Sequence, residues 1–139
     1  MQSSSSSLSF LVIDDEQELA HLYKEFIKEI GYDAVSFTNP ILALEHYKRC
    51  FDKYSLILTD LRMPGMSGIE FANKVRELNS KVKIFLTTAF DMADIKDYKD
   101  YQKAKINKIL QKPIKFSTLR KFIEQELVVQ NVSKDNHDN

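Results

Sequence analysis

Cysteine is almost absent from this sequence, because Cys50 is the only one among 139 residues. A single cysteine cannot form a disulfide within the chain, which suits a reducing cytoplasm. The chain also lacks the basic and apolar regions of a secretory signal, and no apolar run is long enough to cross a bilayer. We therefore expect a cytoplasmic protein.

An excess of charge of either sign is also missing, since 20 basic residues balance 20 acidic ones. No general attraction to nucleic acid or to a membrane surface follows. The hydrophobic content of 43% is ordinary, and 139 residues suffice for one domain with a real core. We expect a serine-rich leader over residues 1–7 that is disordered or a remnant of cloning, one domain over 8–130, and a disordered polar tail over 131–139.

Short apolar runs alternate with segments of helical spacing along the whole chain. Strands are predicted over 8–13, 32–37, 55–60, 82–87 and 106–110. Apolar residues at helical spacing predict helices within 19–30, 43–47, 72–78, 92–98 and 116–127. Five strands that alternate with five helices indicate an α/β fold with a parallel sheet covered on both faces. Periodicity does not reveal the order of the strands.

Several helix boundaries carry their own signals. Gly31 offers a C-terminal stop for the first helix, and Asn39-Pro40 supplies an N-cap and a first-turn proline for the second. Ser67 and Glu70 have the separation of a capping box, and Asp91 can cap the fourth helix. These signals place the helix ends close to the predicted strands.

Two predicted strands stop at carboxylates. The first strand runs into Asp14-Asp15, and the third ends at Asp60, shortly before a turn at Pro64-Gly65. In open α/β sheets, ligands bind just beyond the carboxyl ends of the strands. Clustered carboxylates repel one another unless a cation screens them, and carboxylates with few other ligands suit Mg²⁺. The sequence therefore predicts a magnesium site at this edge of the sheet.

Two further strand ends carry hydrogen-bond donors. The fourth strand leads into Thr87-Thr88-Ala89, and the fifth leads into Lys112-Pro113. A carboxylate can act as a nucleophile and form an aspartyl phosphate. A threonine hydroxyl and a lysine ammonium nearby would then donate to the phosphoryl oxygens. Either Thr87 or Thr88 can supply the hydroxyl.

Together these motifs resemble the receiver domain of two-component response regulators, in particular the stand-alone, chemotaxis-regulator-like kind. The motifs that carry the resemblance are Asp14-Asp15-Glu16, the segment 59–68, Thr88-Ala89 and Lys112-Pro113. The similarity covers roughly residues 8–129. It implies a flavodoxin-like, doubly wound, five-stranded parallel sheet in the order 2-1-3-4-5, with five helices.

The resemblance also implies a role for each acidic residue. Asp60 would be the phosphoacceptor and one of the ligands of Mg²⁺. Asp15 would bind the metal directly, whereas Asp14 would act mainly through bound water. The backbone carbonyl of Arg62 would complete the protein's share of the metal shell.

The remaining motif residues receive roles in the same way. Thr88 would be the switch hydroxyl, and Lys112 would pair first with the acceptor carboxylate and later with the phosphoryl group. Pro113 would hold the adjacent turn through a cis peptide bond. The chain departs from the family at Ile109, where an aromatic residue or histidine is usual. Lys103-Ala104-Lys105 also stands where Gly-Ala often leads into the fifth strand, so we expect that connection to be reshaped.

The implied function is that of a phosphoacceptor and not of an enzyme acting on a separate substrate. Its Mg²⁺-dependent step transfers a phosphoryl group to Asp60 from the phosphohistidine of a histidine kinase or a histidine phosphotransfer protein. The chain would catalyse only its own phosphorylation and slow dephosphorylation. Phosphorylation would switch the face formed by the fourth helix, fifth strand and fifth helix toward an output protein, with no direct binding of nucleic acid or membrane.

Three alternatives remain open at this point. The chain could be a receiver excised from a larger DNA-binding regulator or hybrid kinase, or an adaptor that works without phosphorylation. A phosphatase of the haloacid dehalogenase type also uses an aspartate nucleophile and Mg²⁺. That family requires a second aspartate two residues after the nucleophile, where this chain has Arg62.

Overall fold

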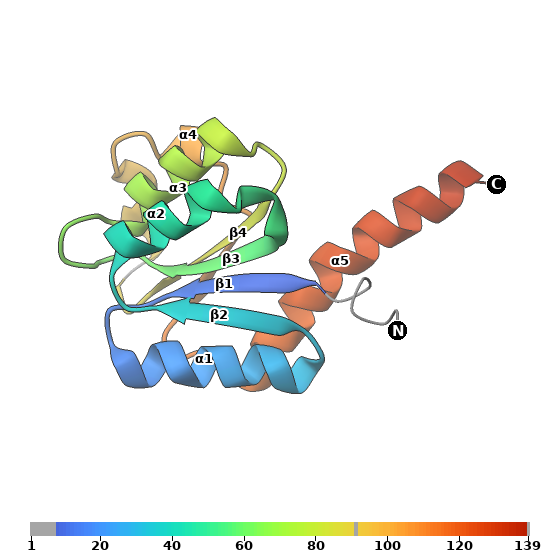
Figure 1. Cartoon of the computed structure of the whole chain (residues 1–139), viewed down its shortest axis with the longest axis horizontal. Helices are drawn as coiled ribbons and strands as arrows, with labels where there is room; N and C mark the ends of the chain where they lie inside the picture. The colour runs from blue at the N-terminus through green and yellow to red at the C-terminus, as the bar shows by residue number, and fades with distance from the viewer. Residues whose placement is uncertain (1–7, 91, 139) are drawn as a thin grey trace.

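The polypeptide forms one five-stranded parallel sheet in the order β2-β1-β3-β4-β5, which confirms the predicted doubly wound fold (Figure 1). The structure is a computed structural model, and it describes residues 8–90 and 92–138. Each strand begins and ends within two residues of the predicted bounds. The strands are β1 Ser9–Ile13, β2 Asp33–Phe37, β3 Tyr54–Asp60, β4 Lys83–Thr88 and β5 Lys108–Gln111.

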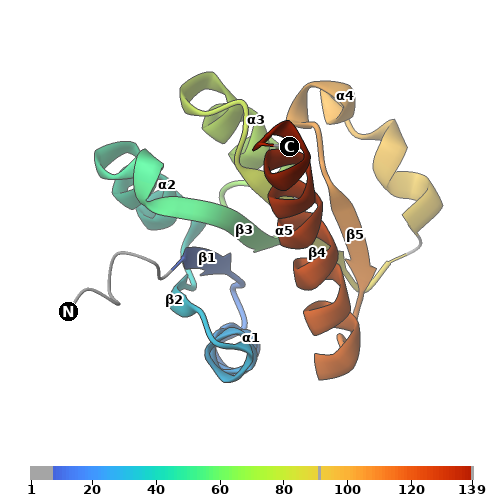
Figure 2. The same cartoon turned by 90° about the vertical axis from the view of Figure 1, so that its right-hand side faces the viewer.

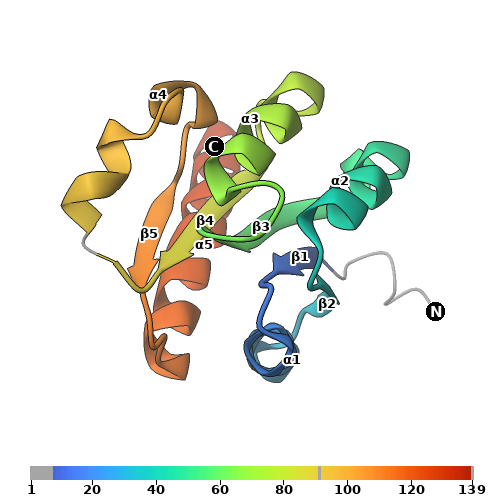
Figure 3. The same cartoon turned by 90° about the vertical axis from the view of Figure 1, so that its left-hand side faces the viewer.

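Helices cover both faces of this sheet, each over its own hydrophobic cluster (Figures 2 and 3). One face carries α1, Gln17–Ile30, and α5, Phe116–Asp138. The other carries α2, Pro40–Arg49, and α3, Gly68–Leu78, with a 3₁₀ turn η2, Phe51–Lys53, after α2. Because the strands in the middle are buried on both sides, they read as continuous apolar runs in the sequence.

The helix boundaries follow the local signals in the sequence. Gly31 ends α1 at φ +120°, a conformation that glycine adopts without strain. The Asn39 side chain accepts hydrogen bonds from the first turn of α2. Ser67 and Glu70 form the reciprocal capping box at the start of α3. These three predictions are confirmed.

The prediction of one fourth helix through residues 92–98 is wrong. The chain instead forms a 3₁₀ helix η3, Met92–Asp97, and a separate four-residue helix α4, Tyr101–Ala104. Between them Asp100 adopts φ +64°, which no continuous helix permits. Aspartates recur at every third position here and compete for backbone groups, which disfavours a regular helix. The predicted cap, Asp91, lies outside the described residues.

The C-terminal helix runs further than the sequence indicates. A disordered tail is predicted from residue 131, but α5 continues to Asp138 and extends away from the sheet (Figure 1). The segment contains no glycine or proline to end the helix, which accounts for the difference. The predicted leader over 1–7 lies outside the described residues. None of the helices in the described ranges combines the length and apolarity needed to cross a bilayer.

Candidate functional site

Three carboxylates meet beyond the carboxyl ends of β1 and β3. Asp14, Asp15 and Asp60 each place one oxygen within 4.8 Å of the others. Asp14 and Asp60 are buried, whereas Asp15 is exposed. Hydrogen bonds from the Asp14 amide to the Phe37 carbonyl, and from the Glu16 amide to Asp14 Oδ1, hold Asp14 just past the end of β1. The structure therefore brings together the three acids that were predicted from the sequence to lie at one site.

Lys112 reaches these acids from the end of β5. Its Nζ atom lies 2.9 Å from Asp14 Oδ2 and 3.3 Å from Asp60 Oδ1. Burial alone would lower the pKa of Lys112, but hydrogen bonding and attraction to Asp14 and Asp60 outweigh it and raise that pKa. The Lys112-Pro113 peptide bond is cis, as the resemblance implied. A charged lysine thus sits among the acids at neutral pH.

One ammonium group does not compensate three carboxylates. Burial, and then repulsion by Asp14, raise the pKa of Asp60 from 3.8 to about 6, although Lys112 acts in the opposite direction. The uncompensated charge is that of two carboxylates, which a divalent cation would balance. Carboxylate oxygens are the ligands that Mg²⁺ prefers, so these residues fit a magnesium ion. No described contact tests whether the Arg62 carbonyl joins them, and that role stays a prediction.

The backbone around Asp60 is held closely. The Leu61 amide donates to Asp60 Oδ1 at 2.9 Å, and the buried Thr59 hydroxyl donates to the Asp60 carbonyl at 3.1 Å. Gly68, the first residue of α3, lies so near that a Cβ atom there would collide with the Asp60 carbonyl oxygen. The sequence placed Gly68 only inside a capping box, because this contact with β3 is not visible in local patterns.

The two threonines at the end of β4 differ in their contacts. Thr88 Oγ1 accepts a hydrogen bond of 2.9 Å from the Phe90 amide, whereas Thr87 Oγ1 is buried with no hydrogen-bond partner in residues 8–90 and 92–138. Thr87 pairs with Asp60 across the sheet, and Thr88 pairs with Gln111. Both therefore stand at the edge that carries the acids. Neither is hydrogen-bonded to Asp60 among the described contacts.

The family comparison agrees with this arrangement. A model of the response regulator receiver domain matches residues 10–124, which is most of the chain. This chain belongs to the response regulator receiver domain family. The fold and the family that the sequence indicated are thereby confirmed.

Two relatives show the contexts in which such a receiver domain occurs. The response regulator receiver protein CpdR of Brucella abortus (strain 2308) is 30% identical over 118 residues, which cover 85% of this chain and 95% of CpdR. The sensor protein EvgS of Escherichia coli (strain K12) is 32% identical over 118 residues, which cover 85% of this chain but only 10% of EvgS. This chain therefore spans a small part of some relatives and nearly all of others.

Solved receiver structures share the fold. A CheY-like receiver domain protein from Methanospirillum hungatei JF-1 superimposes with a TM-score of 0.81 at 21% identity, covering 92% of this chain and 99% of that one. The response regulator TrrA from Thermotoga maritima, solved in complex with Mg²⁺-BeF, has a TM-score of 0.74 at 30% identity. That comparison covers 85% of this chain and 97% of TrrA.

Two exposed side chains of this receiver stack beside the acidic site. The Arg62 guanidinium carbon lies 4.1 Å from the centroid of the Phe90 ring. Arg62 follows β3 by two residues and Phe90 follows β4 by two residues, so the stack joins the two loops next to Asp60. Arg62 was named from the sequence for its backbone carbonyl, and only the structure shows that its side chain contacts Phe90.

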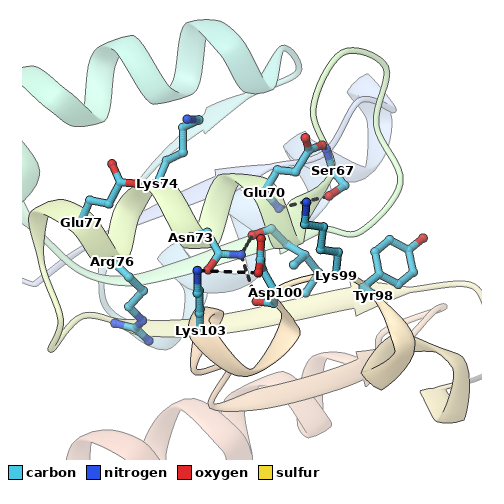
Figure 4. A pocket seen from close by; sticks show the side chains of 11 residues that line it. Ser67, Glu70, Asn73, Lys74, Arg76, Glu77, Tyr98, Lys99, Asp100 and Lys103 are labelled. Atoms are coloured by element: carbon cyan, nitrogen blue, oxygen red, sulfur yellow. Dashed lines mark hydrogen bonds and ion pairs between the residues drawn. The ribbon is translucent and has the colours of Figure 1, made fainter.

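A cavity of about 770 Å³ lies away from the acids, between α3 and the segment that contains η3 and α4 (Figure 4). None of the predicted site residues lines it. Asn73 of α3 points across it and donates to the carbonyl of Asp100 at 3.1 Å (Figure 4). Arg76 donates in the same manner to the carbonyls of Ala104 and Lys105. These hydrogen bonds from α3 hold the segment around α4 in place. The cavity is therefore not part of the acidic site.

Proposed function

We propose that this receiver domain accepts a phosphoryl group on Asp60 from the phosphohistidine of a histidine kinase or a histidine phosphotransfer protein. One observation carries the proposal: a buried acceptor carboxylate lies in contact with Lys112 and within 4.8 Å of two further acids. EvgS, a sensor protein, contains a segment similar to this chain, which supports a donor of this class.

In the proposed step, an Asp60 oxygen attacks phosphorus in line with the leaving imidazole. The new O–P bond forms as the N–P bond breaks, and the imidazole departs with the electron pair of that bond. Asp14, Asp15, Asp60 and the Arg62 carbonyl would hold Mg²⁺, which would neutralise charge on the phosphoryl oxygens. Lys112 would exchange its contact with Asp60 for one with a phosphoryl oxygen.

The response would then travel from Thr88 to the face formed by α4, β5 and α5. Thr88 begins hydrogen-bonded to Phe90, and we propose that its hydroxyl moves to the phosphoryl group. Ile109 on β5 has less volume than an aromatic residue and no polar tip, so we propose a smaller change at this face than an aromatic would give. An output protein would read that change.

The stack of Arg62 on Phe90 favours a long-lived phosphorylated state. Neither side chain offers an acceptor that orients an attacking water, and both stand on the loops beside Asp60. A tenfold change in hydrolysis rate corresponds to about 1.4 kcal/mol in the barrier. Modest shielding of the phosphoryl group from water is therefore sufficient to slow its loss. We propose slow loss of phosphate on this basis.

Incubation with acetyl phosphate and Mg²⁺, followed by intact mass measurement, tests the proposal. Wild type should gain one phosphoryl group, and Asp60→Asn should gain none. Asp15→Ala should require far more Mg²⁺, and Asp52→Asn, an exposed acid on η2, should behave as wild type. Full labelling of Asp60→Asn, or undiminished labelling in excess chelator, would refute the assignment.

A receiver that forms part of a larger regulator or kinase is the second candidate, since the matching segment is a tenth of EvgS. The sequence of the full-length gene would show which arrangement applies. Sustained release of phosphate from small phosphomonoesters would instead favour a phosphatase.

A further inference from the structure

We propose that Gln111 is a positioning residue that clamps Phe90 beside Asp60 and thereby prolongs the phosphorylated state. This inference rests on the proposed function, because it concerns how long a phosphoryl group stays on Asp60. Gln111 is the last residue of β5 and directly precedes Lys112. Neither composition nor motif spacing distinguishes it from an ordinary exposed residue.

Phe90 is held from three directions. The Gln111 side-chain amide donates to the Phe90 carbonyl at 3.2 Å. The Phe90 amide donates to Thr88 Oγ1 at 2.9 Å, and the Arg62 guanidinium stacks on the ring at 4.1 Å. The Gln111 contact is made at the Phe90 carbonyl, on the side from which the chain leaves the site.

The clamp matters because the stacking contact on the ring is weak by itself. Phe90 is 47% exposed, and an exposed cation–π contact contributes little when it acts alone. Loss of the Gln111 bond would loosen the Phe90 carbonyl and, with it, the position of the ring against Arg62. Water would then approach the phosphorus more easily.

The sheet determines where the Gln111 amide can reach. Gln111 pairs with Thr88 across β4 and β5, and the Lys112 amide donates to the Thr88 carbonyl at 2.7 Å. Thr88 Oγ1 accepts from the Phe90 amide, which leaves the hydroxyl proton available for a phosphoryl oxygen. Gln111 thus supports the shielding stack and the switch hydroxyl from one rigid strand.

The experiment compares donor-removing and donor-retaining variants of Gln111 in the full chain. Each protein is labelled with acetyl phosphate and Mg²⁺, freed of the donor, and followed by intact mass. Gln111→Met should shorten the half-life about three- to tenfold, the range that one hydrogen bond supports. Gln111→Lys retains a hydrogen-bond donor and should keep most of the wild-type half-life. Gln102→Met, at an exposed glutamine of α4, should match wild type.

A second comparison separates positioning from general destabilisation. In a Phe90→Ala background, Gln111→Met should have no further effect, because the clamp has nothing left to hold. Normal labelling with an unchanged half-life in Gln111→Met would overturn this inference and leave the proposed function intact. An equal effect of Gln111→Met in both backgrounds would also overturn it. Absence of labelling in wild type would overturn the proposed function and this inference with it.

Discussion

The Nζ atom of Lys112 lies 3.3 Å from Oδ1 of Asp60, although β4 lies between β3, which ends at Asp60, and β5, which Lys112 follows. The same Nζ atom also lies 2.9 Å from Asp14 Oδ2. A cationic side chain thus binds two buried acids from different strands. Its ammonium group offsets part of the negative charge of these two acids.

Replacing Lys112 with Met should therefore destabilise the metal-free protein and prevent labelling. Removal of one partner from a buried ion pair typically costs about 3 kcal/mol or more, because the remaining charges are left uncompensated. Urea unfolding at neutral pH in chelator measures the cost, and Mg²⁺ should recover part of it. Lys99→Met, at an exposed position near α4, is the matched control. Equal losses with and without Mg²⁺ would argue against this account.

The effect of Asp60 on stability should have the opposite sign to that of a usual acid. Its folded-state pKa of about 6 lies above the ordinary 3.8, so stability is highest when the group is protonated and falls as pH rises from about 4 to 6. Asp60→Asn should be more stable than wild type above pH 6 by up to about 3 kcal/mol, and the two should converge near pH 4. Denaturant titrations in chelator measure this, with Asp52→Asn as control. A less stable Asp60→Asn at pH 7.5 contradicts the prediction.

Gly68→Ala should damage the site through the backbone of Asp60. The new methyl group would collide with the Asp60 carbonyl oxygen and lie 2.8 Å from Leu86 Cδ1. Overpacking of this kind costs about 1–3 kcal/mol and should displace Asp60, so both stability and labelling should fall. Gly31→Ala, where φ is +120° but space is open, should lower stability without affecting labelling. Unchanged labelling in Gly68→Ala would show that the site does not depend on a glycine at this position.

Lys105→Gly should stabilise the protein. Lys105 ends α4 at φ +49°, a left-handed conformation that costs a residue with a side chain about 1 kcal/mol relative to glycine. The gain should be about 0.5–1 kcal/mol in thermal or urea unfolding. Lys103→Gly, within the same short helix, should instead lose about 1 kcal/mol. If both substitutions changed the stability in the same direction, the conformational explanation would be ruled out.

Ile109→Tyr should enlarge the response of the α4–β5–α5 face to phosphorylation. A tyrosine at this position of β5 adds volume and a polar tip whose position can change with Thr88. Backbone amide chemical shifts of wild type and Ile109→Tyr, each before and after labelling with acetyl phosphate, provide the measurement. The hypothesis fails if the shifts along η3, α4 and β5 are no larger in the variant.

Much of the fold was predictable because its signals are local. Burial on both sides gives the middle strands continuous apolar runs, and burial on one side gives the helices their spacing. Asn39, Ser67 and Gly31 mark helix ends through contacts within one turn. The segment 92–104 escaped prediction because its form depends on a distant helix. Asn73 and Arg76 of α3 bind the carbonyls of Asp100 and of residues 104–105, and these bonds support two left-handed residues.

The sequence by itself determined which chemical groups end the strands: the acids of β1 and β3, the threonines of β4 and the lysine after β5. It could do so because a residue that follows a buried parallel strand must emerge at the same edge as its neighbours. Only the tertiary structure decided the contacts among them. The 3.3 Å contact of Lys112 with Asp60, the closeness of Gly68 to the Asp60 carbonyl, and the hold of Gln111 on Phe90 each join residues far apart in the chain. Such contacts depend on how the strands and helices pack, and no local pattern in the sequence encodes them.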